Sequence, residues 1–130
     1  MPTFLTDECL ARSVHKSLVD AGEAVESMID RYGRGAKEPV WLPDAGKHRL
    51  IVISKDDAIR KKPAELALLI QHRVLFFAFT PEHVFTAPQQ GETILKALPH
   101  IKRMVQLQSA RDGIVARIHP DGHVTRRPRD

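Results

Sequence analysis

Two uninterrupted apolar runs constrain the fold of this chain more than any other feature of its sequence. Residues 50–54 read LIVIS and residues 74–79 read VLFFAF, so neither run alternates between apolar and polar positions. A strand that is apolar on both faces must be covered on both faces, which is typical of parallel sheets with helices packed on either side. The two runs therefore predict an α/β fold built on a mainly parallel sheet.

The segments around these runs predict the remaining strands and helices. Short β-branched segments predict two more strands, at residues 3–6 and 24–28. Apolar residues at helical spacing predict four helices, over residues 10–21, 40–46, 64–72 and 89–108. Pro63 stands where the start of a helix tolerates proline, and Pro99 predicts a kink or a break in the last helix. Two glycines and a proline predict a loop over residues 30–39.

A hairpin is predicted at the end of the chain. Residues 114–118 and 123–125 flank the turn sequence Pro-Asp-Gly, which commonly joins antiparallel strands. A chain of 130 residues has the length of one domain. We therefore expect a single three-layer α/β sandwich over residues 1–130, ending in a basic hairpin and tail over residues 111–130.

The excess of positive charge lies near the C-terminus. Residues 1–100 carry 13 basic and 13 acidic side chains, whereas residues 101–130 carry seven basic and three acidic ones. A basic segment attracts polyanions through a long-range force that salt screens. The three arginines at positions 126, 127 and 129 are equally compatible with a solvated tail.

The cysteine count and the hydropathy of the chain indicate the cellular compartment in which it is expected. Cys9 is the single cysteine and cannot form an internal disulfide. No apolar run approaches the roughly 20 residues that a membrane helix requires, and Asp7 comes too early for a signal peptide. We expect a cytoplasmic protein that neither spans a membrane nor is secreted.

Acidic residues follow two of the predicted parallel strands at their carboxyl ends. Asp7 and Glu8 follow the first strand, and Asp56 and Asp57 follow the central strand after Lys55. In open α/β sheets, ligands bind beyond the carboxyl ends of the strands. Carboxylates that meet there repel one another by up to about 4 kcal/mol per pair at 4 Å, so they stay ionised beside a cation. Oxygen ligands without His or Cys favour Mg²⁺ or Mn²⁺, which support phosphodiester hydrolysis by activated water.

Helix and turn capping is an alternative role for the same residues. Asp7 precedes a helix and is suited to cap it. Ser54, Asp56 and Asp57 are suited to cap the turn that follows the central strand. Lys55 either balances the acids, holds a phosphate or is a solvated base at a strand end. The pairing of acids across two strand ends favours the metal site.

Three segments resemble the PIN and PIN-like ribonucleases. They are FLTDE at residues 4–8, EPVWLPDAG at residues 38–46 and IVISKDDAIRKKPAE at residues 51–65. Their order and spacing are similar to those of the VapC-related branch of toxin–antitoxin systems, and the resemblance covers nearly the whole chain. It implies a PIN-like fold and a metal-dependent endoribonuclease, whose acidic cluster binds Mg²⁺ or Mn²⁺ and which a cognate antitoxin inhibits.

The resemblance also implies the residues of the site. Asp7 matches the family's acid at the end of the first strand, and Asp56 matches the acid of the strand-Ser-Lys-Asp motif. Glu38 stands where the family has an acid three residues before a Trp-Leu pair, with Asp44 and Asp30 as other candidates for the third carboxylate. Asp7, Glu38 and Asp56 are therefore the predicted catalytic and metal-binding residues.

Four more residues are expected around the metal ligands. Lys55 and Arg60 are predicted to position phosphate, and Glu8 and Asp57 to lie beside the ligands. The implied partners are an RNA substrate and a cognate antitoxin protein, without a membrane. Formation of a homodimer is left open.

Two other functions also stay open. The family's remaining glutamate has no clear match here, since Glu23 and Glu26 are only the nearest acids, so one alternative is an inactive PIN-like interaction module. The other is a phosphoacceptor receiver domain, which would also place an acid pair, Asp56 and Thr80 at successive strand ends. A receiver has a Lys-Pro pair at the end of its last strand, whereas Lys102 falls in a predicted helix. This difference favours the nuclease.

Two further sets of side chains have the chemistry of binding residues. His119 and His123 have the spacing of a metal pair on a helix, but the turn between them removes that geometry and indicates hairpin histidines. Trp41 and the phenylalanines of residues 76–79 are able to stack on bases. Their apolar neighbours favour a place in the core.

Overall fold

The computed structural model describes residues 2–8, 10–55, 62–80 and 86–126. The chain forms, in order, β1 (Thr3–Thr6), α1 (Arg12–Asp20), β2 (Ala24–Ser27), α2 (Met28–Tyr32), α3 (Glu38–Lys47), β3 (Ile51–Ser54), α4 (Pro63–Gln71), β4 (Leu75–Phe79), α5 (Ala87–Gln106), the 3₁₀ helix η2 (Gln108–Asp112), β5 (Ile114–Ile118) and β6 (Val124–Arg126). Each strand predicted from the sequence is therefore present within a residue or two.

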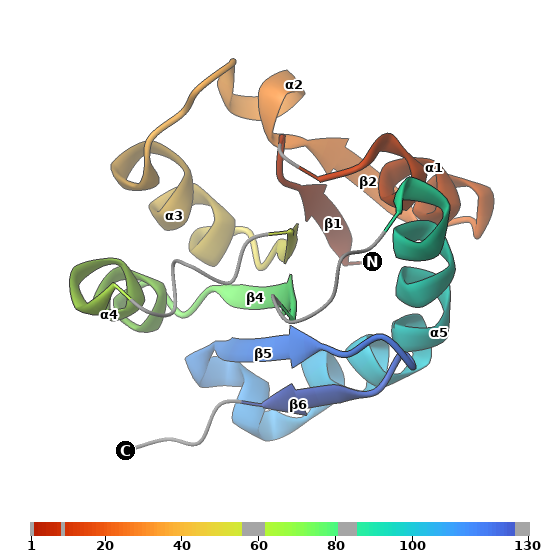
Figure 1. Cartoon of the computed structure of the whole chain (residues 1–130). Coiled ribbons are helices and arrows are strands. Elements are labelled where there is room, and N and C mark those ends of the chain that lie inside the picture. Colours follow the sequence, from red (N-terminus) through yellow and green to blue (C-terminus); the bar gives the residue numbers. More distant parts are fainter. Residues whose placement is uncertain (1, 9, 56–61, 81–85, 127–130) are drawn as a thin grey trace.

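The six strands form one sheet in the order β2-β1-β3-β4-β5-β6. The first five strands in this order are parallel, and β6 pairs antiparallel with β5. The sheet lies between α3 and α4 on one side and α1 and α5 on the other (Figure 1). The structure confirms the predicted α/β sandwich, its mainly parallel sheet and its C-terminal hairpin.

Burial of β3 and β4 on both faces holds the three layers together. Every residue of these two strands is buried. Alternate residues point to opposite faces, so Ile53 and Phe77 pack toward α1 and α5, whereas Val52 and Phe76 pack toward α3 and α4. Full burial of such a side chain contributes about 1.5–3 kcal/mol. Trp41 and the phenylalanines of β4 are part of this core, as predicted.

The predicted loop over residues 30–39 was wrong at both ends. It includes the end of α2, which begins early because the Ser27 side chain accepts a hydrogen bond from the Asp30 N–H at 3.1 Å. It also includes the start of α3, where Pro39 occupies a first-turn position that needs no N–H donor.

Pro99 neither splits nor ends the last helix. The helix α5 runs unbroken for 20 residues, and a capping box formed by Thr86 and Gln89 begins it. Pro99 is exposed, whereas Ile94, Ala97 and Ile101 are buried against the sheet. Packing of this buried face stabilises the helix enough to offset the missing backbone hydrogen bond.

Among the described residues, no helix combines the length and the apolar character that crossing a bilayer requires.

A close approach between α3 and α4 gives the first testable prediction. A Cβ atom added at Gly46 would lie 2.0 Å from the carbonyl oxygen of His72, which is backbone and cannot rotate away. We expect Gly46→Ala to lower the free energy of unfolding by about 2 kcal/mol or more, measured by chemical denaturation.

Gly91→Ala is the matched control, because Gly91 is also helical but its nearest obstacle is the Ser17 hydroxyl, at 2.8 Å. This side chain can rotate, and alanine favours a helix, so we expect a change below about 1 kcal/mol. Equal losses in the two variants would contradict the backbone clash at Gly46.

Candidate functional site

Asp7 lies at the carboxyl edge of the sheet and is held there by the neighbouring strand. It follows β1 directly, and its N–H donates to the carbonyl oxygen of Ile53 on β3 at 3.1 Å. The buried Ser54, the last residue of β3, donates its hydroxyl to Asp7 Oδ2 at 2.9 Å. The N-cap of α1 is Ala11, without a side-chain cap, so Asp7 does not cap this helix. The Asp7 carboxylate is therefore oriented by β3.

The connection between α2 and α3 reaches the same edge. Glu8 is exposed, and its Oε1 accepts a hydrogen bond from the N–H of Gly35 at 3.0 Å. Glu38 follows three residues later in the first turn of α3 and is half-buried. Since α3 leads back to the amino end of β3, its first turn lies toward the carboxyl edge. The structure thus brings Asp7, Glu8 and the segment that leads to Glu38 together.

The remaining predicted site residues follow β3. Lys55 comes directly after this strand and is exposed. Asp56, Asp57 and Arg60 lie outside the described residues, so their predicted roles stay predictions.

The described residues at this edge supply only some of the ligands that a divalent metal ion needs. Carboxylate oxygens such as those of Asp7 and Glu38 are the ligands that Mg²⁺ and Mn²⁺ prefer. Among the described residues, no three His, Cys, Asp or Glu side chains are grouped closely enough to hold a metal ion. A site of three carboxylates would need an acid from outside the described residues, and Asp56 is the one that the sequence predicts.

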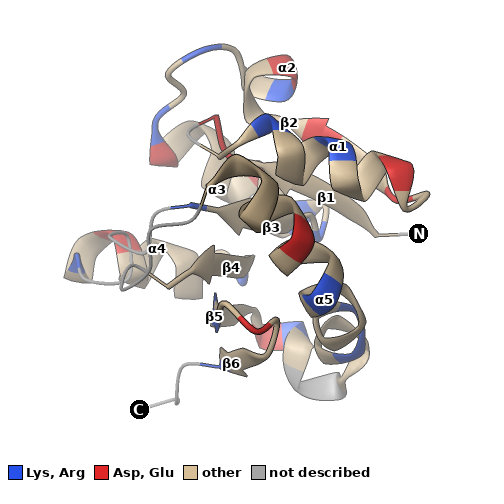
Figure 2. Cartoon of the chain, turned by 45° about the vertical axis from the view of Figure 1, so that its right-hand side comes forward, with Lys and Arg blue, Asp and Glu red and all other residues tan. Residues whose placement is uncertain are grey.

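A groove of about 700 Å³ opens beside Asp7 at the carboxyl edge. Thr6 and Glu8, which flank Asp7 in the sequence, both line it. Its charged lining comprises three bases, Arg12, Lys16 and Arg34, and two acids, Glu8 and Asp30. Residues of both charge signs lie on α1 and α2 (Figure 2). The three bases are suited to contact phosphate groups of a ligand.

This groove was not predicted from the sequence, although the sequence contains a signal for part of its lining. Arg12, His15 and Lys16 have helical spacing, which places them on one face of the helix that follows the first acids. His15 Nδ1 lies 3.1 Å from the hydroxyl of Thr6, the last residue of β1. Because Thr6 ends β1, this contact places that face of α1 at the carboxyl edge of the sheet.

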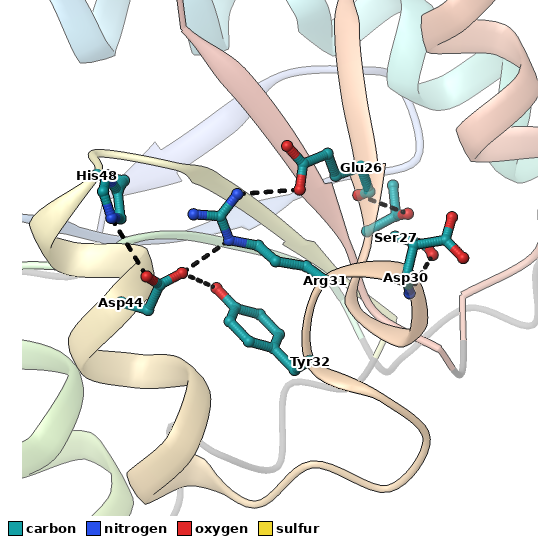
Figure 3. Close-up of polar contacts among 8 residues, drawn as sticks. Glu26, Ser27, Asp30, Arg31, Tyr32, Asp44 and His48 are labelled. Carbon is teal, nitrogen blue, oxygen red and sulfur yellow. Dashed lines mark hydrogen bonds and ion pairs between the residues drawn. The ribbon is translucent and has the colours of Figure 1, made fainter.

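A second group of charged residues joins β2, α2 and α3 (Figure 3). Arg31 on α2 lies 3.0 Å from Glu26 on β2 through Nη1 and 2.7 Å from Asp44 Oδ2 on α3 through Nε. Asp44 Oδ2 also accepts a hydrogen bond from the Tyr32 hydroxyl at 2.8 Å, and Asp44 Oδ1 lies 3.3 Å from His48 Nε2. These contacts fix the position of α3 relative to α2.

The group removes several acids from the set of metal-ligand candidates. The carboxylates of Glu26 and Asp44 are both bound to Arg31, and Glu23 forms an ion pair with Lys102 at 2.6 Å. A carboxylate that is already neutralised by a guanidinium or ammonium group has little need of a metal ion. Of the candidates for a third carboxylate that the sequence offers, these contacts engage Asp44 but neither Glu38 nor Asp30.

The same contacts shift the pKa values of Asp44, Arg31 and Tyr32. The hydrogen bond from Arg31 and, to a smaller degree, that from Tyr32 lower the pKa of Asp44 below its ordinary value against the opposing effect of burial. The Asp44 carboxylate in turn raises the pKa of Arg31. Burial, followed by the hydrogen bond to Asp44, raises the pKa of Tyr32. Asp44 is thus held as a carboxylate.

The two hairpin histidines stack on one another. The ring centroids of His119 and His123 lie 4.0 Å apart, with planes parallel to within 1°. His119 Nε2 lies 2.7 Å from the Thr125 hydroxyl, and His123 Nδ1 lies 2.5 Å from Asp121 Oδ1. The prediction of a hairpin pair, rather than a helical metal pair, is confirmed.

The end of β5 argues against the receiver alternative. The order of the five parallel strands is also that of receiver domains, so topology alone does not separate the two classes. His119 follows β5 where a receiver would place its lysine, and Lys102 lies within α5 in an ion pair with Glu23. The chain lacks the residue that a receiver needs at this point.

The lowered pKa of Asp44 gives a prediction about acid stability. Because this pKa is lower in the folded than in the unfolded chain, the stabilisation is present above the unfolded-state pKa of about 3.9 and is lost as the pH falls through the folded value. We expect Asp44→Asn to lower the free energy of unfolding at neutral pH by about 1–2 kcal/mol. This value allows for screening of the ion pair by solvent, because the Asp44 side chain is 32% exposed. The difference in the free energy of unfolding between the wild-type protein and Asp44→Asn should disappear as the pH falls below about 4.

Denaturant titrations of both proteins over this pH range provide the measurement. Asp20→Asn, a change of the same charge at the exposed end of α1, should alter stability by less than about 0.5 kcal/mol. If the difference in the free energy of unfolding between the wild-type protein and Asp44→Asn stayed constant from neutral to acid pH, the ion pair would not stabilise the fold.

Comparison with known proteins places this arrangement in a family. Residues 2–81, more than half of the chain, match the PIN-like domain family. No curated protein and no solved structure gives a significant match. The matched region runs from β1 to β4 and includes Asp7, Glu38 and Asp56. Members of the family are often nucleases and typically bind divalent metal ions. The chain belongs to the PIN-like domain family.

Proposed function

We propose that this protein is a metal-dependent endoribonuclease that acts as the toxin of a toxin–antitoxin system. The observation that carries the proposal is the Asp7 carboxylate, which Ser54 orients at the carboxyl edge of a PIN-like sheet. Ser54 stands two residues before Asp56 in the sequence, so the strand that orients the first acid also leads into the second. One or two carboxylates, together with waters and substrate phosphates, are typical of a Mg²⁺ site.

Asp7, Glu38 and Asp56 are the proposed ligands of a Mg²⁺ or Mn²⁺ ion. When bound, the ion supplies an activated water and stabilises charge on the phosphoryl group. Ser54 keeps the Asp7 carboxylate in one orientation through the hydrogen bond to Oδ2. A carboxylate oxygen that is not a ligand accepts the proton of the attacking water. Lys55 and Arg60 contact the phosphate, and Glu8 and Asp57 support the ligands.

The groove beside Asp7 supports RNA as the substrate. Arg12, Lys16 and Arg34 line it from α1 and from the segment between α2 and α3. Cationic side chains along a groove contact successive phosphates of a single strand, and such contacts are independent of sequence. The groove therefore offers a path for the strand past the acids.

The toxin role and its antitoxin partner rest on the resemblance of the three motifs to the VapC-related branch. Inhibition by an antitoxin requires a protein that covers the carboxyl edge, where substrate would otherwise enter. A second copy of this chain is a further possible partner.

The test of catalysis is substitution of the acids. We expect Asp7→Asn and Asp56→Asn each to reduce Mn²⁺-dependent cleavage of single-stranded RNA by about 100-fold or more, because each removes a charged metal ligand. Cleavage of a labelled RNA on denaturing gels gives the rate, and isothermal titration with Mn²⁺ gives metal affinity. Both readouts should fall together.

Asp20→Asn is the matched control, since it removes the same charge at the far end of α1 and should leave both readouts unchanged. Full activity in Asp7→Asn would remove this residue from the mechanism. A wild-type protein that binds no divalent metal and cleaves no RNA would instead favour an inactive interaction module.

The groove gives a separate prediction about substrate binding. Arg12→Gln/Lys16→Gln removes two exposed charges that line the groove without touching the acids. We expect KM for RNA to rise while kcat changes by less than about threefold, because the lost contacts act on the ground state and the transition state alike. A fall in kcat at unchanged KM would contradict a binding role.

A further inference from the structure

A second pocket lies at the opposite, amino edge of the sheet. It has a volume of about 480 Å³ and opens where α3 and α4 end and η2 precedes β5. Half of its eight lining residues are lysine or arginine, namely Lys47, Arg49, Arg73 and Arg111, and His72 is another. None of the described residues that line it is acidic. Asp7 follows the carboxyl end of β1 and so lies at the opposite edge of the sheet.

The three arginines stand two or three residues before three adjacent strands. Arg49 stands two residues before β3, Arg73 two residues before β4 and Arg111 three residues before β5. These strands are neighbours in the sheet. Neighbouring strands lie about 4.8 Å apart, so the arginines form a row of about 10 Å along the edge.

Arg49 forms hydrogen bonds with the loops that carry the other two arginines. Its Nη1 donates to the carbonyl oxygen of Arg73 at 3.4 Å, and its Nη2 donates to that of Ala110 at 2.7 Å. The Arg49 side chain thereby connects the loops in front of β3, β4 and β5. We assign it a positioning role.

The other cations of the pocket are available to a ligand. Lys47, Arg73 and Arg111 are exposed. Within the described part of the chain, none of these three side chains forms an ion pair or a hydrogen bond. Like charges in such a short row repel one another, and no carboxylate of the pocket compensates them. The row is therefore suited to an anionic ligand.

The backbone at two of these positions is unusual. Arg49 and Arg73 have φ values of 54° and 55°, and they are the only described residues other than glycine with positive φ. Each follows the end of a helix, where glycine commonly takes this conformation without strain. An arginine there keeps a charged side chain at a steric cost, which is typical of a residue whose side chain is used.

Helix electrostatics account for only part of the row. A basic residue near a helix C-terminus compensates the partial negative charge of the free carbonyl groups, and Lys47 in the last turn of α3 fits this role. Arg111 lies in the last turn of η2, a 3₁₀ helix of five residues. These separate helix ends do not explain why the cations converge on one pocket.

We propose that this pocket binds phosphate groups of a nucleic-acid backbone, at a site separate from the carboxyl edge. Guanidinium groups donate paired hydrogen bonds to phosphate oxygens, and a row of them matches the repeated charge of a polynucleotide. The proposal goes beyond the proposed cleavage function, because binding here requires neither the acids nor a metal ion. An RNA held at both edges would have to extend across the length of β4, about 17 Å.

The experiment measures binding of a fluorescein-labelled single-stranded RNA of about 12 nucleotides by fluorescence anisotropy, in EDTA so that no cleavage takes place. Lys47→Gln/Arg111→Gln removes two exposed charges of the pocket and leaves Arg49 intact. We expect affinity in low salt to fall at least about fivefold. The slope of log Kobs against log salt should become shallower by about 1.4, which corresponds to two lost phosphate contacts.

Lys96→Gln/Arg103→Gln is the matched control, since it removes the same charge from exposed positions of α5. It should change affinity by less than about twofold. Equal losses in the two double variants, or no loss in the pocket variant, would overturn the proposal. Thermal melts of all variants verify folding, and Arg73→Gln provides an independent variant of the same pocket.

Two further measurements separate the alternatives. The binding assay contains EDTA and therefore needs no bound metal ion, so a failure of the catalytic proposal would leave its result intact. A labelled polyglutamate peptide of similar length tests an acidic protein as the ligand. If Lys47→Gln/Arg111→Gln weakened binding of the peptide but not of the RNA, the site would be one for an acidic protein and the proposal would be wrong.

Discussion

The need to cover both faces of β3 and β4 determines the architecture of this protein. All residues of these strands are buried, so helices must pack on either side of the sheet. Crossover connections then return the chain through each helix, and all five parallel strands point the same way. The consequence is a molecule with two chemically different edges. Strand ends carry acids at one edge, and the loops before the strands carry arginines at the other.

Local partners decide what each carboxylate of this fold does. Asp44 is bound to Arg31 and Tyr32, which stabilise its ionised form and tie α2 to α3. Asp7 lies at the end of β1, and its Oδ2 accepts a hydrogen bond from the Ser54 hydroxyl, which orients the carboxylate. The Asp44 carboxylate thus links two helices, whereas the Asp7 carboxylate is positioned by the neighbouring strand.

Much of the fold was predictable because its strongest signals are local. The apolar runs of β3 and β4, the helical spacing before β4 and the turn sequence of the hairpin each lie within a few consecutive residues. The errors occurred where a distant contact or a single cap overrides the local signal. The Ser27 cap begins α2, which extends into the segment predicted as a loop, and the packing of α5 against the sheet stabilises that helix through Pro99.

By itself, the sequence determined the α/β class and placed acids after β1 and β3, since apolar periodicity and strand ends are read from neighbouring residues. It equally contains an arginine before each of β3, β4 and β5. Only the tertiary structure decided that these residues meet, because the order of the strands in the sheet depends on packing among segments far apart in the chain. That order joins Asp7 to Ser54 at one edge and aligns Arg49, Arg73 and Arg111 at the other.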